Sequence, residues 1–429
     1  MLFATFPAFP SCDLDGCDGI ELRLDLFTHW SIDRLQSFLA SQTKPVMFTI
    51  RNGSKKQIHE CLKLKPQYFD LDAVFAFNIE DYPDTKFILS YHNFSDTPKD
   101  LESIYFSMKK RKAFAYKIAC HAASSNDALR MLLFSREHLD LSTICMGEKG
   151  EWARALGPVV GNVIDYACIN QKTAPGQLTV SEMVDIYRYR SLNQETDLYG
   201  LIGDPIFQSQ GHIYHNAQFC TNAVYVKMCV KAEELSEFFP LAEELGFKGL
   251  SVTMPLKTAV IPFVETKDSS VNTIRITDGK KTGISTDGKG AMDLFGDVKD
   301  KVILILGAGG AAIAIAKEAQ ARRAHVWIHN RTKRDLGYPT GIPDHYDIVI
   351  NCTPSGDESV LKPGIIVMDI VYVPRDTDFL KKAKQLGCQV VYGEEMFFNQ
   401  AALQREFWGC DRQGNFKNIG DSGKSHCHC

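Results

Sequence analysis

The sequence predicts an α/β protein made of three parts: a closed parallel (β/α)8 barrel (a TIM barrel) and two open α/β sheets that follow it. Eight short apolar runs, spaced by stretches long enough for helices, fill roughly the first 190 residues, as a barrel of this type requires. A polar stretch at 190–197 then interrupts the pattern, and a strongly apolar run at 301–306 enters a glycine-rich turn. These observations predict the barrel, a linker and a final nucleotide-binding sheet.

The barrel prediction depends on the eight runs and on their spacing. We expect strands at 2–6, 19–25, 45–50, 68–72, 86–91, 114–119, 142–146 and 162–167. Each is separated from the next by room for a helix, and eight successive βα units imply a closed barrel. Because the region is short for this fold, its loops should be tight.

We place the domain boundaries where the pattern changes. The barrel is expected over 1–190, a linker over 191–197, one open sheet over 198–290, a second with a returning C-terminal helix over 291–410, and a polar tail over 411–429. The tail ends in His426-Cys427-His428-Cys429, which could bind a metal. It lacks a second ligand pair at zinc-site spacing, so we expect a frayed terminus and no metal site.

Composition narrows the class of protein. The chain is 45% apolar and 23% charged with a net charge of -4, which is ordinary for a soluble globular protein and gives no indication of nucleic-acid or membrane partners. No apolar run approaches the length of a membrane span, and the N-terminus lacks the basic region of a signal peptide. The 13 cysteines are scattered and odd in number, so reduced thiols in a cytoplasmic enzyme are expected.

Charged residues mark the expected strands of the barrel. Glu21, Arg23 and Asp25 alternate along the second strand, which places all three on one face. The later strands carry or are followed by further polar residues, in the order Arg51, Asp72, His92, Lys117 and Arg154. Functional side chains of such barrels gather at the carboxyl ends of the strands. The set therefore predicts a site, although each residue alone has a bland explanation.

The residue types suit an anionic carbonyl substrate. Arginines hold a carboxylate through paired hydrogen bonds. A buried lysine with a lowered pKa can condense with a ketone and form an electron sink. A histidine can move the proton next to the imine and protonate a leaving hydroxyl. Alone, Lys117 would more often be a lysine at a strand edge, and His92 a core or surface histidine.

The first part of the chain resembles type I 3-dehydroquinate dehydratase over roughly 1–190. The motifs are Glu21-Leu-Arg23-Leu-Asp25, Phe48-Thr-Ile-Arg51, Ser90-Tyr-His92-Asn-Phe94, Tyr116-Lys117-Ile-Ala119 and Thr173-Ala-Pro-Gly-Gln177. The resemblance implies a Schiff base on Lys117 and His92 as general acid and base. It also implies that Arg51 and Arg154 hold the carboxylate, while Glu21, Arg23 and Gln177 hold hydroxyls. The family usually has Glu at Asp72 and Ser at Thr173.

The second part contains a dinucleotide-binding signal. Gly307-Ala308-Gly309-Gly310-Ala311 follows a buried strand and opens a helix, so the backbone can approach a pyrophosphate at the helix N-terminus. About twenty residues on, where an acidic residue would bind a free ribose hydroxyl, the chain has Arg331 and Arg334. These residues favour NADP over NAD, the alternative being a solvated basic turn.

This part resembles shikimate dehydrogenase over about 198–410. The motifs include Leu201-Ile-Gly203-Asp-Pro205, Ser251-Val-Thr253-Met-Pro-Leu-Lys257, Val271-Asn272-Thr273, Thr286-Asp287-Gly288, Asn330-Arg331-Thr332, Asn351-Cys-Thr353-Pro354 and Asn399-Gln400-Ala401. The resemblance implies a catalytic pair, Lys257 and Asp287. It implies substrate contacts from Ser209, Thr253, Asn272, Tyr372 and Gln400, and cofactor contacts from the glycine turn, Asn330, Arg331, Thr332, Arg334, Thr353 and Gly393. Alone, Asp287 would be a turn aspartate and Thr353 part of a plain loop.

Two positions depart from that family. Its substrate loop usually has a second serine where this chain has Gly211, and an asparagine where it has Ser251. Losing a hydrogen bond to a charged group costs on the order of 1.5–3 kcal/mol unless another donor replaces it. His212 or the amide of Gly211 could compensate. The preference for shikimate or quinate is therefore left open.

The two implied reactions are consecutive, since dehydration of 3-dehydroquinate gives 3-dehydroshikimate, which NADPH reduces to shikimate. We therefore expect a bifunctional, cytoplasmic enzyme that uses NADP(H) and resembles the fused enzymes of the shikimate pathway. Two alternatives stay open: a quinate dehydrogenase in the second half, and a non-catalytic sensor of these compounds. The retained Lys117, His92, Lys257 and Asp287, and the lack of a basic DNA-binding segment, argue against the sensor.

Overall fold

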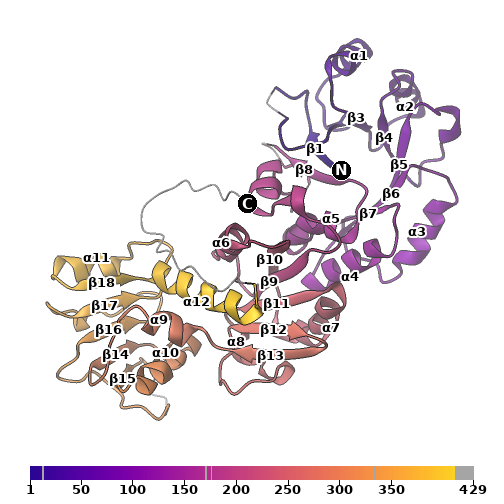
Figure 1. Cartoon of the computed structure of the whole chain (residues 1–429). Helices are drawn as coiled ribbons and strands as arrows, with labels where there is room; N and C mark the ends of the chain where they lie inside the picture. Colours follow the sequence, from indigo (N-terminus) through magenta and orange to yellow (C-terminus); the bar gives the residue numbers. More distant parts are fainter. Residues whose placement is uncertain (12–13, 170–171, 175, 333–334, 411–429) are drawn as a thin grey trace.

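The computed structural model describes residues 1–11, 14–169, 172–174, 176–332 and 335–410. Three sheets follow one another along the chain (Figure 1), with eight, five and five strands. This arrangement confirms the predicted α/β class: a barrel followed by two open sheets. Among the described residues, no helix combines the length and the apolar character that a membrane span needs.

The first sheet is a nearly closed parallel barrel. Its strands are β1 Leu2–Phe6, β2 Gly19–Arg23, β3 Val46–Thr49, β4 Tyr68–Asp72, β5 Lys86–Asn93, β6 Ala115–His121, β7 Leu141–Met146 and β8 Asp165–Cys168. They pair in the order β7-β6-β5-β4-β3-β2-β1-β8. The two end strands approach each other where Val163 N–H donates to Leu141 O at 3.4 Å and Ile164 N–H to Ser142 Oγ at 2.9 Å.

The helices of the barrel are fewer than the spacing predicts. Full helices follow four strands, namely α1 Ile32–Ser41, α2 Lys55–Leu62, α3 Leu101–Lys109 and α4 Ser125–Arg136. Serine caps begin several of them; Ser54 and Ser124 each form a capping box with the residue three positions later. Among the described residues, β1 leads to β2 without a helix. After β4 and β7 come η1 Ile79–Asp81, and η2 Glu148–Leu156 with α5 Gly157–Val160. The tight connections that we expected are therefore found where short 3-10 or α-helical turns replace full helices.

The second sheet is mixed. Its strands are β9 Asp197–Gly203, β10 Ala223–Cys229, β11 Phe247–Val252, β12 Thr273–Thr277 and β13 Lys280–Ile284, in the order β10-β9-β11-β12-β13. β9 pairs in parallel with β10 and β11, while β12 and β13 are antiparallel additions. The helices of this region are α6 Gly211–Gln218, α7 Leu235–Leu245, α8 Leu256–Ala259 and α9 Asp287–Met292.

The third sheet is parallel throughout. Its strands are β14 Val302–Leu306, β15 His325–His329, β16 Ile348–Asn351, β17 Ile366–Asp369 and β18 Gln389–Tyr392, in the order β15-β14-β16-β17-β18. Its helices are α10 Gly310–Ala321, α11 Asp378–Gln385 and α12 Gly393–Trp408. α12 runs back to the second sheet (Figure 1), where Trp408 Nε1 donates to Ile274 O at 2.9 Å. Residues of α12 can therefore contribute to a site on the second sheet.

The barrel and the second sheet share one continuous apolar core, which contains residues from Leu2 to Ile276. α4 of the barrel packs against α7 of the second sheet. Ser125 Oγ on α4 also donates to Cys229 O at the end of β10, at 2.8 Å. The two halves are thus held together by packing as well as by the linker. The domain boundaries stay a prediction. Of the expected linker over 191–197, the first residue ends η4 (Tyr189–Ser191) and the last, Asp197, begins β9.

Candidate active sites

A buried lysine lies at the centre of the barrel site. Lys117 on β6 is 4% exposed and forms an ion pair with Asp70 on β4. Ser90 on β5, which is paired with Lys117 in the sheet, donates its Oγ–H to Asp70 Oδ1 at 2.6 Å. Burial lowers the pKa of the Lys117 amine, and the negative charge of Asp70 opposes this effect. Burial thus favours the neutral amine, which is the form that an amine nucleophile requires, while the ion pair with Asp70 favours the charged form.

Asp70 is a residue of this site that we did not predict from the sequence. Asp70 and Asp72 are two residues apart on β4, so both point to the same face of the strand, as do Glu21 and Arg23 on β2. This spacing of two residues could have indicated that Asp70 lies on the same face as Asp72. The structure places Asp70 against the lysine, whereas Asp72 accepts a hydrogen bond from Val74 N–H at 3.1 Å. Asp72 therefore organises the turn at the end of β4.

Arg51 connects the lysine site with His92. Its Nη1 lies 2.8 Å from Ser90 Oγ and 3.1 Å from His92 Nδ1, and its Nη2 lies 3.3 Å from Asp70 Oδ1. Since a guanidinium only donates, His92 Nδ1 is the acceptor and the ring is neutral with its proton on Nε2. Burial, followed by the positive charges of Arg51 and Lys117, lowers the pKa of His92 to about 2.

The remaining predicted barrel residues lie around the carboxyl ends of the strands. Glu21 accepts hydrogen bonds from Thr5 at 2.8 Å and Thr49 at 2.6 Å. Arg23 forms a two-point ion pair with Asp25, at 3.0 and 2.7 Å. Both side chains are thus fixed by neighbours on the barrel face that carries Lys117.

The loops after β7 and β8 meet above the barrel. Arg154 Nε donates to Cys145 O at 2.9 Å, which places it by the end of β7. Thr173 donates from both its N–H and its Oγ to Gln177 Oε1, at 2.8 and 3.0 Å. A Cβ on Gly176 would lie 2.2 Å from Gly147 O, so only glycine permits this contact between the loops.

Buried histidines predict acid sensitivity. Burial lowers the pKa values of His92, His212 and His215 to about 2, 4 and 3. An unfolded histidine titrates near 6.5, so below that pH the unfolded chain binds more protons and stability falls by up to roughly 1.4 kcal/mol per histidine and pH unit. We expect the melting temperature to fall between pH 7 and pH 5. The fall should be smaller in His92→Gln and unchanged in His345→Gln, which alters an exposed ring; equal slopes in all three proteins would contradict this assignment.

A second lysine site lies on the second sheet. Lys257 Nζ on α8 is 2.5 Å from Asp287 Oδ2 at the start of α9. Asn272 Nδ2 donates to Asp287 Oδ1 at 2.8 Å, and it also lies 3.0 Å from Thr286 Oγ1 and from Gln400 Oε1. Asp287 is buried while Lys257 is partly open. The arrangement is an oriented lysine that can exchange a proton with a ligand.

The C-terminal helix completes this site. Gln400 and Gln404 lie on α12, and Gln404 Nε2 donates to Asn272 O at 3.2 Å. Ser251, which replaces the usual asparagine of the family, donates its Oγ–H to Gln404 Oε1 at 2.9 Å. Its hydroxyl is thus part of the support of the site. Sequence analysis missed Gln404, which lies four positions after Gln400, one helical turn along the same face of α12.

The expected substrate loop precedes α6. Gly211 N–H donates to Ser209 Oγ at 3.2 Å, and the hydroxyl of Tyr372 also hydrogen-bonds with Ser209. The ring of His212 lies against that of Tyr187, at a centroid distance of 5.9 Å. Of the two groups that could compensate for the missing serine, the Gly211 amide is already engaged by Ser209. His212 contacts the barrel through its ring, and its Nδ1 has no hydrogen-bond partner within the described part of the chain. The fifth predicted contact, Thr253, lies beside Gly203, whose added Cβ would be 2.3 Å from Thr253 Cγ2.

The glycine turn enters α10 next to Lys257. Gly307 has φ +105, in the region that favours glycine, and an added Cβ would lie 3.0 Å from Thr353 Cγ2. A Cβ on Gly310 would lie 2.8 Å from Ser270 Oγ and 3.7 Å from Lys257 Cδ, whereas one on Gly309 would meet no atom within 4 Å. The turn of 307–311, which includes Ala308 and Ala311, thus combines close packing with an open backbone at the N-terminus of α10.

Other predicted cofactor residues follow the neighbouring strands. After β15, Asn330 Nδ2 donates to Thr332 O at 2.7 Å, and Arg331 is exposed. Arg334 lies outside the described residues. After β16, Thr353 Oγ1 donates to Asn351 Oδ1 at 2.7 Å. A Cβ on Gly393 would lie 2.6 Å from Asp369 O, so glycine allows α12 to start against the end of β17.

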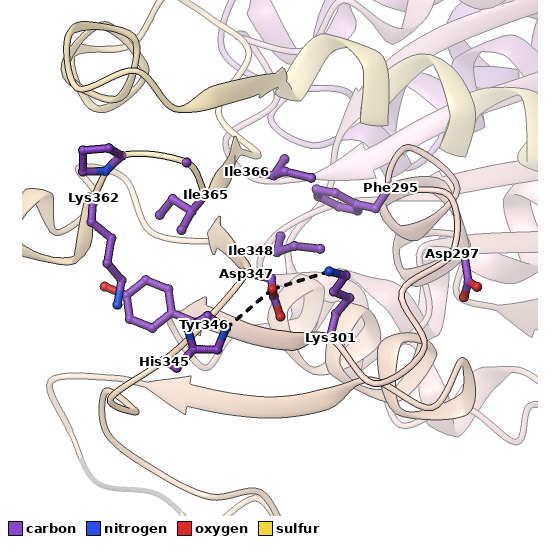
Figure 2. Close-up of a pocket in the computed structure, with 12 residues that line it drawn as sticks. Phe295, Asp297, Lys301, His345, Tyr346, Asp347, Ile348, Lys362, Ile365 and Ile366 are labelled. Carbon is purple, nitrogen blue, oxygen red and sulfur yellow. Dashed lines mark ion pairs between the residues drawn. The ribbon is translucent and has the colours of Figure 1, made fainter.

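A separate cavity of about 330 Å³ lies at the amino ends of the strands of the third sheet, opposite the glycine turn. Figure 2 shows Lys301, Asp347 and Ile366 lining it, at or next to the starts of β14, β16 and β17. Asp347 forms ion pairs with Lys301 and His345, both at 3.6 Å. The glycine turn is at the carboxyl ends of these strands, where parallel sheets bind their ligands. This cavity is therefore not the expected cofactor site.

The chain is a bifunctional α/β enzyme, with a lyase in the barrel and an oxidoreductase in the second half. The family model for type I 3-dehydroquinase matches residues 11–194, and that for the shikimate dehydrogenase substrate binding domain matches 201–275. The shikimate biosynthesis protein AroDE of Chlamydia pneumoniae is 34% identical over 91% of this chain and 90% of its own length.

A chloroplastic bifunctional 3-dehydroquinate dehydratase/shikimate dehydrogenase of Arabidopsis thaliana is 28% identical over 92% of this chain and 78% of its own length. A solved shikimate dehydrogenase in complex with NADP+ is 34% identical, with a TM-score of 0.48 over 51% of this chain and 91% of that chain. The chain belongs to the family of fused type I 3-dehydroquinate dehydratases and shikimate dehydrogenases.

Proposed function

We propose that the barrel converts 3-dehydroquinate to 3-dehydroshikimate through a Schiff base on Lys117, and that the second half then reduces 3-dehydroshikimate to shikimate with NADPH. The observation that carries the proposal is the presence in one chain of two oriented lysines, Lys117 beside Asp70, Arg51 and His92, and Lys257 beside Asp287 and Asn272.

In the dehydratase half, neutral Lys117 attacks the ketone carbon, and water leaves as the imine forms. His92 removes a proton from the carbon next to the imine, and the electrons pass into the protonated C=N bond. The adjacent hydroxyl then leaves as water with the proton from His92, and hydrolysis of the imine frees Lys117. Arg51 binds the substrate carboxylate. The charge of this carboxylate offsets that of Arg51, which after burial is the second cause of the low pKa of His92 in the free enzyme.

In the dehydrogenase half, Lys257 donates a proton to the ketone oxygen as it becomes a hydroxyl. Asp287 holds the ammonium through the 2.5 Å contact, and Asn272 fixes Asp287. The residues of the turn 307–311 would hold the pyrophosphate of NADPH, which supplies a hydride when bound. The open backbone at Gly309 fits such a ligand, and a Cβ added at Gly310 would lie 3.7 Å from Lys257 Cδ, so the turn is next to the proposed proton donor.

The basic turn after β15 predicts the cofactor preference. Arg331 is exposed there, and a 2′-phosphate is the group that an arginine at this place would bind. We expect Arg331→Ala to raise KM for NADPH by roughly tenfold, because an ion-paired hydrogen bond contributes about 1.5–3 kcal/mol. KM for NADH should stay within about twofold, and equal changes for both cofactors would contradict this role.

Quinate is a second candidate substrate for the dehydrogenase half. Quinate carries one hydroxyl more than shikimate, on the carbon that bears the carboxylate, and Gly211 leaves out a side chain beside Ser209. Rates of NADP+ reduction with shikimate and with quinate compare the two directly. Formation of 3-dehydroshikimate from 3-dehydroquinate without cofactor tests the barrel separately. A chain inactive in all three assays, yet able to bind these compounds, would be a sensor.

A further inference from the structure

Helix α6 sets the position of the expected substrate loop of the dehydrogenase. The helix begins at Gly211, and Ser209 lies two residues before it. The Gly211 N–H to Ser209 Oγ bond of 3.2 Å connects the helix start with the loop hydroxyl. Any rotation or shift of α6 therefore moves the group that is expected to bind the substrate carboxylate.

The C-terminal end of α6 is held by the barrel half. Arg188, at the end of that half, donates from its guanidinium to Phe219 O at 2.8 Å, Thr221 O at 3.0 Å and Ala223 O at 2.9 Å. Phe219 is the C-cap of α6, Thr221 lies between α6 and β10, and Ala223 is the first residue of β10. The last carbonyls of a helix lack partners within it and carry partial negative charge, so a cation is favoured there.

The backbone of Arg188 adopts an uncommon conformation. Its φ is +54, in the left-handed region that residues with a Cβ seldom occupy. Such a conformation persists only where the surroundings stabilise it. Here the three hydrogen bonds to the neighbouring half provide that stabilisation.

The N-terminal end of α6 also touches the barrel half. η3 (Glu182–Ile186) packs against α6, and the next residue, Tyr187, contacts the ring of His212 in the first turn of the helix. On the other side, Lys227 Nζ on β10 donates to Ser209 O at 3.4 Å. Two consecutive barrel residues, Tyr187 and Arg188, thus hold both ends of a dehydrogenase helix.

We infer that Arg188 is a positioning residue for the dehydrogenase, through which the barrel half fixes α6 and the carboxylate-binding loop before it. This inference rests on the proposed function of the second half. It implies that the affinity of the dehydrogenase for its substrate depends on a residue of the dehydratase, although Arg188 is not a catalytic residue of either site.

The same interface offers a matched control. Arg136 on α4 also donates to backbone carbonyls across the interface, to Glu244 O at 3.0 Å and Leu245 O at 3.4 Å, near the end of α7. α7 lies between β10 and β11, whereas the substrate loop directly precedes α6. Loss of Arg136 should therefore weaken the contact between the halves without moving Ser209.

The test measures both activities in full-length Arg188→Ala and Arg136→Ala. For Arg188→Ala we expect KM for shikimate to rise roughly tenfold, with KM for NADP+ and the dehydratase kcat/KM within about twofold of wild type. Arg136→Ala should leave all three values within about twofold. An unchanged KM for shikimate in Arg188→Ala, or an equal rise in Arg136→Ala, would overturn the inference.

Two additions keep the test decisive. If Arg188→Ala misfolds and loses dehydratase activity as well, Arg188→Lys keeps the charge but cannot reach three carbonyls, and it should show an intermediate rise in KM. Wild-type oxidation of shikimate is measured first, since its absence contradicts the proposed function and not the role of Arg188. In that case, the Kd for shikimate is measured by calorimetry on the same variants and replaces KM. The same fold-changes in Kd are then expected, and the same outcomes would overturn the inference.

Discussion

Lys117→Met is expected to reduce the dehydratase rate by at least about a thousandfold, because it removes the amine that forms the imine and methionine cannot replace it. Methionine fills nearly the same volume, so the buried site keeps its packing, although Asp70 loses its ion-pair partner. The NADP-dependent activity should stay within about twofold of wild type, since Lys257 lies on α8 in the other half of the chain. Initial rates of 3-dehydroshikimate formation and of shikimate oxidation measure the two effects on one sample.

Chemical trapping tests the same lysine directly. Borohydride added with 3-dehydroquinate should reduce the imine and leave a ligand mass on the peptide that contains Lys117. Lys117→Met should gain no mass. Lys86→Met, which alters an exposed lysine at the start of β5, should be trapped like wild type. A trapped adduct in Lys117→Met, or full dehydratase activity there, would show that another residue forms the bond.

Lys257→Met should lower the dehydrogenase kcat by about 10²- to 10⁴-fold, the usual contribution of a positioned proton donor. KM for NADPH should change little because the glycine turn is unaltered, and the dehydratase rate should be that of wild type. Lys289→Met supplies the control, since Lys289 is an exposed lysine on α9 that pairs with Asp293. If Lys257→Met kept more than about a tenth of the wild-type kcat, the proton would have to come from another group.

The overall architecture could be predicted because apolar runs report buried strands. All eight expected barrel runs contain or overlap an observed strand, with end points that shift by a few residues; the eighth strand is Asp165–Cys168 where 162–167 was expected. The alternation of apolar runs could not show which connections contain helices. The loop after β4, for example, needs only η1 to reach β5.

Contacts between residues that are distant in sequence are the part of the two sites that the sequence could not predict. Lys117 and His92 could be selected because Lys117 lies within an apolar strand run and His92 ends another. Asp70 could not be assigned to Lys117, because its contact depends on the pairing of β4 with β5 and of β5 with β6. Gln404 likewise reaches Ser251 only because α12 returns from the third sheet. The contacts of Arg188 with α6 join two halves and leave no local pattern in the sequence.

To learn whether one chain performs two consecutive reactions, the purified protein is supplied with 3-dehydroquinate and NADPH. NADPH absorbance is followed while mass spectrometry monitors shikimate. We expect NADPH loss to be matched by shikimate formation. Either Lys117→Met or Lys257→Met should stop this conversion, and mixing the two variants should restore it. Accumulation of 3-dehydroshikimate without NADPH loss, or no conversion of 3-dehydroquinate, would contradict it.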